Sequence, residues 1–335
     1  NKYYALDLAP GRSLVEYLVQ KGQQVFLASW RNPDERHAEW GIDTYVQALV
    51  DALDAVRRIS ATERAMLFGF CSGGIIASMT AACLAGIGQQ SRLAALGLGV
   101  TVLDFANAGV SRALVDDRLA GAAKTRSRRR GYLDGRALAE VFAWLRPGDL
   151  VWNYWVNNYL LGRKPPAFDI LFWNADTTRM SAALHADFVD LAMGNRLVQP
   201  NATAVRGVPI DLSRVDVDTY VVAGIADHLT PWQSCYRNTQ LVGGQSRFIL
   251  STSGHIAALV NPPSNPKASY RVNSDHDADA ETWLKGAETR AGSWWPDVVD
   301  WLNEHGGAEK PAPQRPGRRG LRPLVDAPGT YIFDT

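Results

Sequence analysis

A cysteine between two glycines is the residue of this sequence best placed to do chemistry. Residues 65–70 form a short apolar run, Gly69-Phe70-Cys71-Ser72-Gly73 follows, and an alanine-rich stretch with helical character continues to residue 85. A Gly-x-nucleophile-x-Gly pattern between a strand and a helix is typical of a nucleophile elbow, a sharp turn that exposes its central side chain. The sequence therefore predicts nucleophilic catalysis by the thiol of Cys71.

The two glycines indicate which residue of the turn is the nucleophile. At the tip of so sharp a turn the backbone approaches itself closely, so we expect Gly69 and Gly73 where a Cβ would collide. A nucleophilic Ser72 would place Phe70 at the first glycine position, and we disfavour it. The structural alternative is that Cys71 is a small buried core residue, as most free cysteines are.

A carboxylate and an imidazole follow two later apolar runs. Residues 218–224 precede Asp227, and residues 246–250 precede His255. A nucleophile, an acid and a histidine in this order, each after a strand, is the chain order of the α/β-hydrolase triad. A thiol with an ordinary pKa of ~8.5 is only a few per cent ionised at neutral pH, so it needs an imidazole to take its proton. The predicted triad is Cys71, Asp227 and His255, in which Asp227 fixes the tautomer of the imidazole.

Other residues near strand ends compete for these roles. Asp104 also follows an apolar run and is a second candidate for the acid. His228 directly follows Asp227, and we expect it to support the site or cap a helix rather than do direct chemistry. The backbone N–H of Ser72, at a predicted helix N-terminus, is the expected oxyanion donor. Its partner would come from a loop after an upstream strand, which would lie at or before Asn1.

The order of apolar runs predicts the fold class. Strands are expected at residues 24–30, 65–70, 93–103, 218–224 and 246–250, and helices at residues 13–21, 43–60, 72–85 and 293–301. Asp43 is placed to cap the second helix, and Pro231 to open a helix after the acid loop. This alternation predicts an α/β-hydrolase fold with a mostly parallel sheet and helices on both faces.

The alternation stops between residues 105 and 212. We expect a cap subdomain there, inserted between two strands of a core formed by residues 1–104 and 213–308. Residues 309–335 are rich in Pro, Gly and Arg and are expected to form a surface strap. Aromatic residues of the insertion could cover the site or simply pack a small helical subdomain; they are Trp144, Trp152, Tyr154, Trp155 and Tyr159.

The insertion also carries a basic run, which consists of Lys124, Arg126, Arg128, Arg129 and Arg130. We favour a solvated loop over a specific phosphate contact for this run. Over the whole chain, 35 Lys and Arg residues against 34 Asp and Glu residues give a net charge of +1, so no global field indicates nucleic acid or an anionic membrane.

The remaining features of the sequence bear on the cellular compartment of the protein and on whether the chain is part of a longer one. Three cysteines, Cys71, Cys83 and Cys235, cannot form a disulfide framework and suit a reducing cytoplasm. We find no apolar stretch long enough to span a membrane, no signal peptide and no metal-binding motif. The chain begins at Asn1 without a methionine, and we expect it to be a piece of a longer protein.

Several longer strings closely resemble polyhydroxyalkanoate synthases. These strings occupy residues 69–74, 152–155, 168–174, 227–232, 253–256, 261–263 and 292–296. The resemblance extends over essentially the whole chain and is to the catalytic domain of the class I and class II enzymes. It implies an acyltransferase that polymerises (R)-3-hydroxyacyl-CoA into polyester and releases coenzyme A.

The resemblance also implies roles and partners. Cys71 would carry the growing chain as a thioester, His255 would activate the thiol and the incoming hydroxyl, and Asp227 would orient His255. Coenzyme A would belong to the substrate, with no further cofactor and no nucleic acid. The enzyme would act as a homodimer at the surface of cytoplasmic polymer granules. The second oxyanion donor would come from the region of Asn1 to Tyr4.

Two other functions fit parts of the same pattern. A thiol hydrolase, either a thioesterase or a polyester depolymerase, could use the same triad, because a fold and a triad do not set the acceptor. A granule-coating or interaction module with a vestigial site would explain the aromatic insertion and the basic tail without catalysis. A thiol nucleophile favours the synthase, since exchange between thioesters is reversible while water is excluded.

Overall fold

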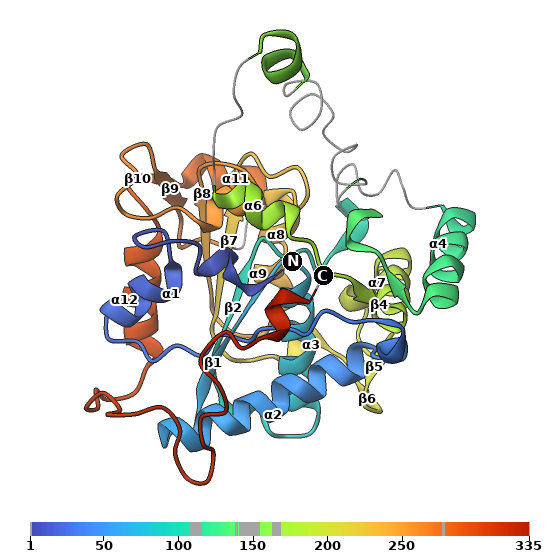
Figure 1. Ribbon diagram of the computed structural model, residues 1–335. Helices are drawn as coiled ribbons and strands as arrows, with labels where there is room; N and C mark the ends of the chain where they lie inside the picture. Colours follow the sequence, from blue (N-terminus) through green and yellow to red (C-terminus); the bar gives the residue numbers. More distant parts are fainter. Residues whose placement is uncertain are drawn as a thin grey trace.

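A six-stranded sheet organises the computed structural model, which describes residues 2–107, 116–137, 140, 155–162, 169–276 and 279–334 (Figure 1). The strands in spatial order are β1 (Ala65–Phe70), β2 (Leu93–Gly99), β7 (Thr219–Gly224), β8 (Ser246–Ser251), β9 (Ser269–Val272) and β10 (Glu288–Ala291). Neighbours from β1 to β8 run parallel, and β9 and β10 add to the edge in antiparallel fashion. The predicted mostly parallel sheet is confirmed.

Helices cover both faces of the sheet, as predicted. The main ones are α1 (Leu14–Gln20), α2 (Ile42–Ser60), α3 (Ser72–Gly86) and α12 (Trp295–His305). Alternate residues of β7 enter two separate cores, because successive side chains of a strand point to opposite faces. Val221 and Ala223 pack with α2 and α3, whereas Tyr220 and Val222 pack with α1 and α12. A strand buried on both faces needs an unbroken apolar run, which is why this strand was visible in the sequence.

Polar side chains determine the residue at which each of the first two helices begins. Ser13 caps α1, since its Oγ accepts the N–H of Glu16 at 2.8 Å. The prediction that Asp43 caps α2 is wrong. A cap at Asp43 would start the helix at residue 44, but α2 begins two residues earlier, at Ile42, whose N–H donates to Asp187 Oδ2 at 2.8 Å. An acceptor from a distant helix thus satisfies an N–H that has no partner within α2.

Two predicted strands differ from the structure. Residues 24–30 alternate in exposure but form no strand in the described part of the chain. Strand β2 ends at Gly99 rather than near residue 103, because Val100 has a φ of +43°, which ends an extended strand. Because residues 24–30 form no strand, β1 pairs only with β2 among the described residues and forms one edge of the sheet.

The insertion contains more regular structure than the sequence indicated. Besides short 3-10 helices, its described elements are α4 (Asp117–Arg130), β3 (Tyr132–Leu133), a π-helix (Trp155–Leu160), α6 (Asp169–Ala175), β4 (Met180–Ser181), α7 (Ala182–Gly194), β5 (Ala204–Val205) and β6 (Val208–Pro209). The basic run predicted as a loop lies in α4, which Asp116 caps by accepting the N–H groups of Arg118 and Leu119. Leu184 and Leu191 of α7 belong to the same core as α2 and α3.

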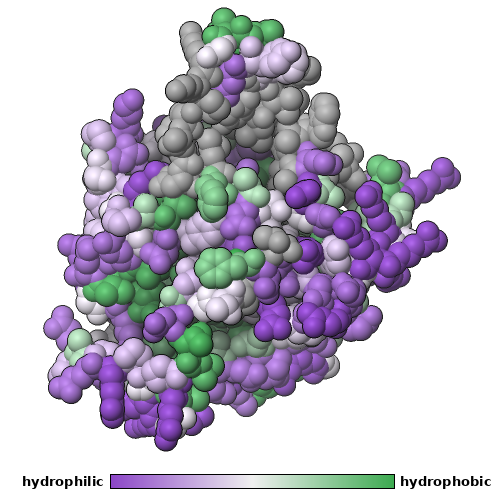
Figure 2. All heavy atoms as spheres, viewed as in Figure 1, coloured by the Kyte–Doolittle hydropathy of each residue, from purple (hydrophilic) through white to green (hydrophobic). Residues whose placement is uncertain are grey.

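Part of the aromatic insertion is exposed. Trp155 and Tyr159 stack with ring centroids 4.4 Å apart, and both side chains are exposed, as are Leu160 and Leu161. Figure 2 shows this apolar group at the top of the molecule, and hydrophilic residues over the side that α4 occupies in Figure 1. The predicted aromatic residues Trp144, Trp152 and Tyr154 lie outside the described residues, and the boundaries of a cap subdomain stay a prediction.

The C-terminal segment lies on the surface, and polar contacts attach it to distant parts of the chain. Lys310 Nζ donates to the carbonyl of Ala61 at 3.0 Å, and Arg58 donates to the carbonyl of Arg319 at 2.9 Å. Asn32 donates to the carbonyl of Asp334 at 3.2 Å. Across the described residues, no helix combines the length and the apolar character that a membrane crossing requires.

Close packing at the start of α3 depends on glycines, though not on both of the predicted ones. A Cβ on Gly69 would lie 2.5 Å from the carbonyl oxygen of Gly73 and 2.6 Å from the Cα of Gly74. A Cβ on Gly74 would overlap Thr101, with Cγ2 only 2.7 Å away. The expectation for Gly73 is wrong, because a Cβ there would enter open space.

Alanine substitutions at these neighbouring glycines should therefore have opposite consequences. We expect Gly74→Ala to lower the free energy of unfolding by about 1–3 kcal/mol, since Thr101 is buried and must shift. Gly73→Ala is the matched control and should leave stability unchanged or raise it by about 0.5–1 kcal/mol, because alanine favours the helix. Urea denaturation measures both, and equal destabilisation by the two variants would contradict the packing described.

Candidate active site

Cys71 sits in a backbone conformation that side chains rarely adopt. Its φ is +53° and its ψ is −125°, between the end of β1 and the first residue of α3. Three hydrogen bonds hold it there: its N–H donates to the carbonyl of Gly99 at 2.9 Å, and its carbonyl accepts from Gly74 N at 2.9 Å and Thr101 Oγ1 at 3.2 Å. Strained residues of this kind persist only where surrounding contacts determine them, and they concentrate at functional sites.

The thiol of Cys71 differs from the other two thiols of the chain. Cys71 is exposed, whereas Cys83 and Cys235 are buried, so the alternative of a buried core cysteine is contradicted for Cys71. Burial raises the pKa of the thiols of Cys83 and Cys235. Desolvation also raises the pKa of Cys71, but the hydrogen bond and charge of His255 together with the N–H of Ser72 outweigh it, so this pKa is lowered.

The loop after β7 delivers a buried carboxylate. The side chain of Asp227 is fully inaccessible to solvent, and four hydrogen bonds compensate its charge. Oδ1 accepts the N–H groups of Leu229 at 2.9 Å and Thr230 at 3.0 Å, while Oδ2 accepts Thr230 Oγ1 at 2.5 Å and His255 Nδ1 at 2.6 Å. Desolvation raises the pKa of Asp227, but the hydrogen bonds from these donors outweigh that effect. The pKa is therefore lowered, and the carboxylate stays ionised.

His255 links the carboxylate to the thiol. It is the first residue of α10 (His255–Leu259), and the loop before it turns through Ser253 at a φ of +82°. Because Nδ1 contacts Asp227, Nε2 is the ring nitrogen left for the hydrogen bond with Cys71. Desolvation lowers the pKa of His255, but the bonds to Asp227 and Cys71 raise it above its usual value. The hydrogen bond with His255 therefore favours the ionised form of the Cys71 thiol.

Two buried tryptophans hold the short helix that begins with His255. Trp294 Nε1 donates to the carbonyl of Ala258 at 2.8 Å, and Trp295 Nε1 donates to the carbonyl of Leu259 at 3.0 Å. Both indoles are at most 2% exposed. The last carbonyls of a helix have no partner within it, so these donors stabilise α10 where it would otherwise fray.

The structure brings Cys71, Asp227 and His255 together, and it separates the competing residues from them. Asp104 accepts Asn195 Nδ2 at 2.9 Å and faces Arg237, so it does not orient His255. His228 is half-buried next to Asp227, and its supporting role stays a prediction. The N–H of Ser72 contacts the sulfur of Cys71, which is compatible with the predicted oxyanion role without testing it. Asn1, near which the second donor was expected, lies outside the described residues.

Thr230 is the member of the site that the sequence analysis missed. Its hydroxyl donates to Asp227 Oδ2 at 2.5 Å and lies 3.2 Å from His255 Nδ1, while its N–H donates to Asp227 Oδ1. An Asp followed three residues later by Thr is typical of a turn closed by side-chain to backbone hydrogen bonds. That spacing could have identified Thr230. Among the described residues, no group of three or more His, Cys, Asp or Glu side chains is arranged to hold a metal.

The ionisation of Cys71 should appear in its alkylation rate. Because the pKa of Cys71 is lowered, we expect iodoacetamide to label it as the thiolate at pH values well below the ordinary thiol pKa. In His255→Gln the thiol of Cys71 stays desolvated but loses the imidazolium that lowers its pKa. The alkylation profile should therefore move to higher pH, and the rate at pH 7 should fall by about tenfold or more. Cys235 is the internal control for a buried thiol. An unchanged profile in His255→Gln would contradict the pairing.

Thr230 should change the pKa of Asp227 and act on the thiol of Cys71 only through that carboxylate. In Thr230→Val the carboxylate of Asp227 loses a donor that lowers its pKa, so the acid limb of the alkylation profile should move to higher pH. We expect a loss of about fivefold in labelling rate at neutral pH, the effect of one hydrogen bond. Thr230→Ser keeps the hydroxyl and should restore both properties. If serine and valine behave alike, Thr230 acts only through packing.

Comparison with known proteins supports the fold described above. A family model described as alpha/beta hydrolase fold matches residues 6–262. Poly(3-hydroxyalkanoate) polymerases 2 and 1 of Ectopseudomonas oleovorans are each 46% identical to the chain, over 99% and 100% of its length and 60% of theirs. The polymerase subunit PhaC of Cupriavidus necator is 40% identical over 99% of the chain and 57% of its own length. The chain thus spans about three fifths of the length of these relatives. By its family match and its sheet, the chain belongs to the alpha/beta hydrolase family.

Proposed function

We propose that this chain carries the catalytic site of a poly(3-hydroxyalkanoate) polymerase, which transfers 3-hydroxyacyl groups from coenzyme A to a growing polyester. The observation that carries the proposal is the hydrogen-bonded series from Cys71 through His255 to Asp227, in a chain 46% identical to such polymerases. A thiol nucleophile with a paired base suits acyl transfer between thioesters.

The positions of these groups support the following loading step. The thiolate of Cys71 attacks the thioester carbonyl of a hydroxyacyl-CoA, and a new carbon–sulfur bond forms to the enzyme. The N–H of Ser72, at the start of α3, donates to the negative oxygen of the tetrahedral intermediate. The bond to the sulfur of coenzyme A then breaks, and the imidazolium of His255 gives its proton to the leaving thiolate. Coenzyme A is released, and the acyl group stays on Cys71.

In the elongation step, His255 accepts a proton instead of donating one. Neutral His255, held in one tautomer by Asp227, takes the proton of a 3-hydroxyl group as its oxygen attacks the acyl carbonyl on Cys71. An ester bond forms, and Cys71 leaves as a thiolate beside the restored imidazolium. The step needs no metal or other cofactor, because the energy of the thioester drives ester formation, and coenzyme A takes part only as substrate and product.

The surroundings of the reaction belong to the same proposal. We place the enzyme in the cytoplasm as a homodimer at the surface of polymer granules. The exposed apolar group of Trp155, Val156, Tyr159, Leu160 and Leu161 supports contact with an apolar polyester. Nothing in the near-neutral overall charge favours a nucleic acid.

Replacement of the nucleophile tests the proposal directly. With 3-hydroxybutyryl-CoA or a longer homologue, Cys71→Ala should abolish release of coenzyme A. Cys71→Ser should lower it by more than about a hundredfold, since an alcohol needs far stronger activation than a thiol. Cys83→Ala, at a buried cysteine outside the site, is the matched control and should retain activity. Undiminished release from Cys71→Ala would end the proposal.

Product analysis separates the polymerase from the hydrolase that the same triad permits. A polymerase yields insoluble polyester together with coenzyme A, whereas a thioesterase or depolymerase yields free hydroxy acid. Release of coenzyme A with hydroxy acid as the main product would replace the proposal with hydrolysis. An interaction module with a vestigial site would show neither product.

A further inference from the structure

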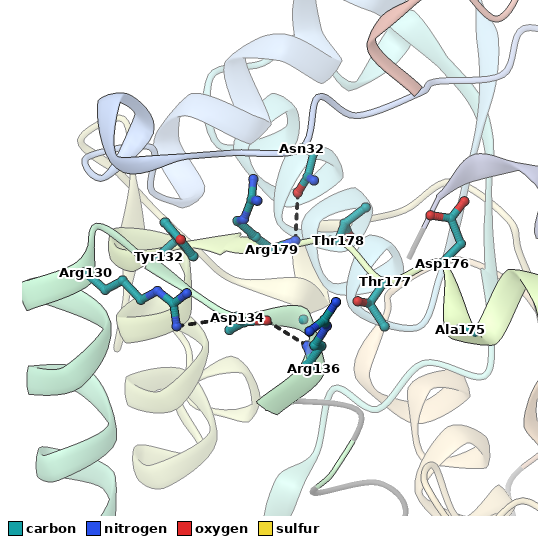
Figure 3. A pocket seen from close by; sticks show the side chains of 11 residues that line it. Asn32, Arg130, Tyr132, Asp134, Arg136, Ala175, Asp176, Thr177, Thr178 and Arg179 are labelled. Carbon is teal, nitrogen blue, oxygen red and sulfur yellow. Dashed lines mark hydrogen bonds and ion pairs between the residues drawn. The ribbon is translucent and has the colours of Figure 1, made fainter. Parts of the chain in front are cut away.

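A polar cavity of about 260 Å³ lies between the insertion and the loop at Asn32, and no triad residue lines it (Figure 3). Three segments that are far apart in the sequence form its wall: the loop at Asn32, residues 130–136 after α4, and residues 175–179 after α6. Close backbone contacts join two of these segments, since a Cβ on Gly135 would meet the carbonyl oxygen of Thr178 and lie 2.8 Å from Thr177 Oγ1. Two of the three wall segments are therefore packed tightly against each other.

Contacts within the protein position two arginines of the cavity. The guanidinium carbons of Arg130 and Arg179 lie 4.8 and 5.0 Å from the centre of the Tyr132 ring. The Arg130 side chain also lies 3.2 Å from Asp134 Oδ2, and the backbone N–H of Arg179 donates to Asn32 Oδ1 at 2.8 Å. Arg136 also lines the cavity, so three arginines surround one small volume (Figure 3). Such planar forks match the oxygen atoms of a phosphate.

The charge around the cavity is positive in balance. Its lining holds three arginines and the two carboxylates of Asp134 and Asp176. Asp176 is compensated from outside the lining, because Lys2 Nζ lies 2.8 Å from Oδ1 and the hydroxyl of Tyr4 donates to Oδ2 at 2.7 Å. Asp134 is shared with Arg130. A concave site with excess positive charge concentrates anions.

We propose that this cavity binds a phosphate group of the coenzyme A portion of the thioester substrate, an inference that rests on the proposed function. The volume is smaller than the range of about 300–1,000 Å³ found for sites that enclose a whole small molecule, so it suits a phosphate group rather than a complete nucleotide. The flexible pantetheine arm separates the phosphates of coenzyme A from its thioester. No triad residue lines the cavity, so a phosphate group bound there would be held apart from the reacting thioester.

Substrates with and without the nucleotide test the assignment. For Arg136→Gln and Arg179→Gln we expect KM for 3-hydroxyacyl-CoA to rise about tenfold, the effect of a lost charge-assisted hydrogen bond, with little change in kcat. KM for the matching 3-hydroxyacyl-pantetheine, which lacks the nucleotide, should stay unchanged. Arg128→Gln, on the exposed surface of α4 and outside the cavity, is the matched control. Equal changes with both substrates, or none with either, would overturn the proposal.

A binding measurement keeps this test separate from the test of the proposed function. Calorimetric titration with adenosine 3′,5′-bisphosphate should show binding to the unmodified protein and to Arg128→Gln, and about tenfold weaker binding to Arg136→Gln. This result would support the cavity even if the protein released no coenzyme A. Binding that is equal in all three proteins would reject the cavity even if the polymerase activity were present. Inorganic phosphate that binds as tightly as the bisphosphate would assign the site to free phosphate and overturn the assignment to coenzyme A.

Discussion

The positive φ of Cys71 is the constraint on which the rest of this structure depends. A side chain held in that conformation costs about 1–3 kcal/mol, so the neighbouring structure must compensate for it. The carbonyl of Gly99, at the end of the adjacent strand, accepts the N–H of Cys71, and Thr101 donates to its carbonyl. Gly69 and Gly74 then let the helix start close to the strand. The reward for this arrangement is an exposed thiol at the N-terminus of a buried helix.

The second requirement is electrostatic, and it is met by loops from the same edge of the sheet. The carboxyl ends of β1, β7 and β8 lie together because these strands run parallel around β2. The loops after them deliver Cys71, Asp227 and His255, which are 156 and 28 positions apart along the chain. Asp227 is buried and ionised, so His255 retains its proton, and the charge on His255 stabilises the thiolate. Each pKa shift in the site depends on the next residue in the series.

The sequence predicted what continuous patterns and fixed spacings encode. Doubly buried strands such as β7 need unbroken apolar runs, and the elbow needs its motif, so both were located. Residues 24–30 show a strand-like alternation, yet no partner among the described residues gives them a ladder, because pairing depends on neighbours rather than on the run itself. The antiparallel strands β9 and β10 were missed since they are short, and β10 is exposed throughout. The contacts of Thr230 and Asp187 depend on tertiary structure, and the cavity between Asn32, Arg136 and Arg179 depends on segments that no local pattern connects.

The pair of indole hydrogen bonds that stabilises the helix of His255 has a consequence for protein engineering. The donors belong to the start of α12, so the general base depends on a segment about 40 residues further along the chain. In a chimera, the C-terminal part of this protein is exchanged for that of a relative. If the junction falls between Leu259 and Trp294, His255 is separated from the indoles that stabilise its helix. A junction placed after His305 keeps the two together. The smallest transferable unit of this active site therefore includes its closing helix, although no residue of that helix takes part in the chemistry.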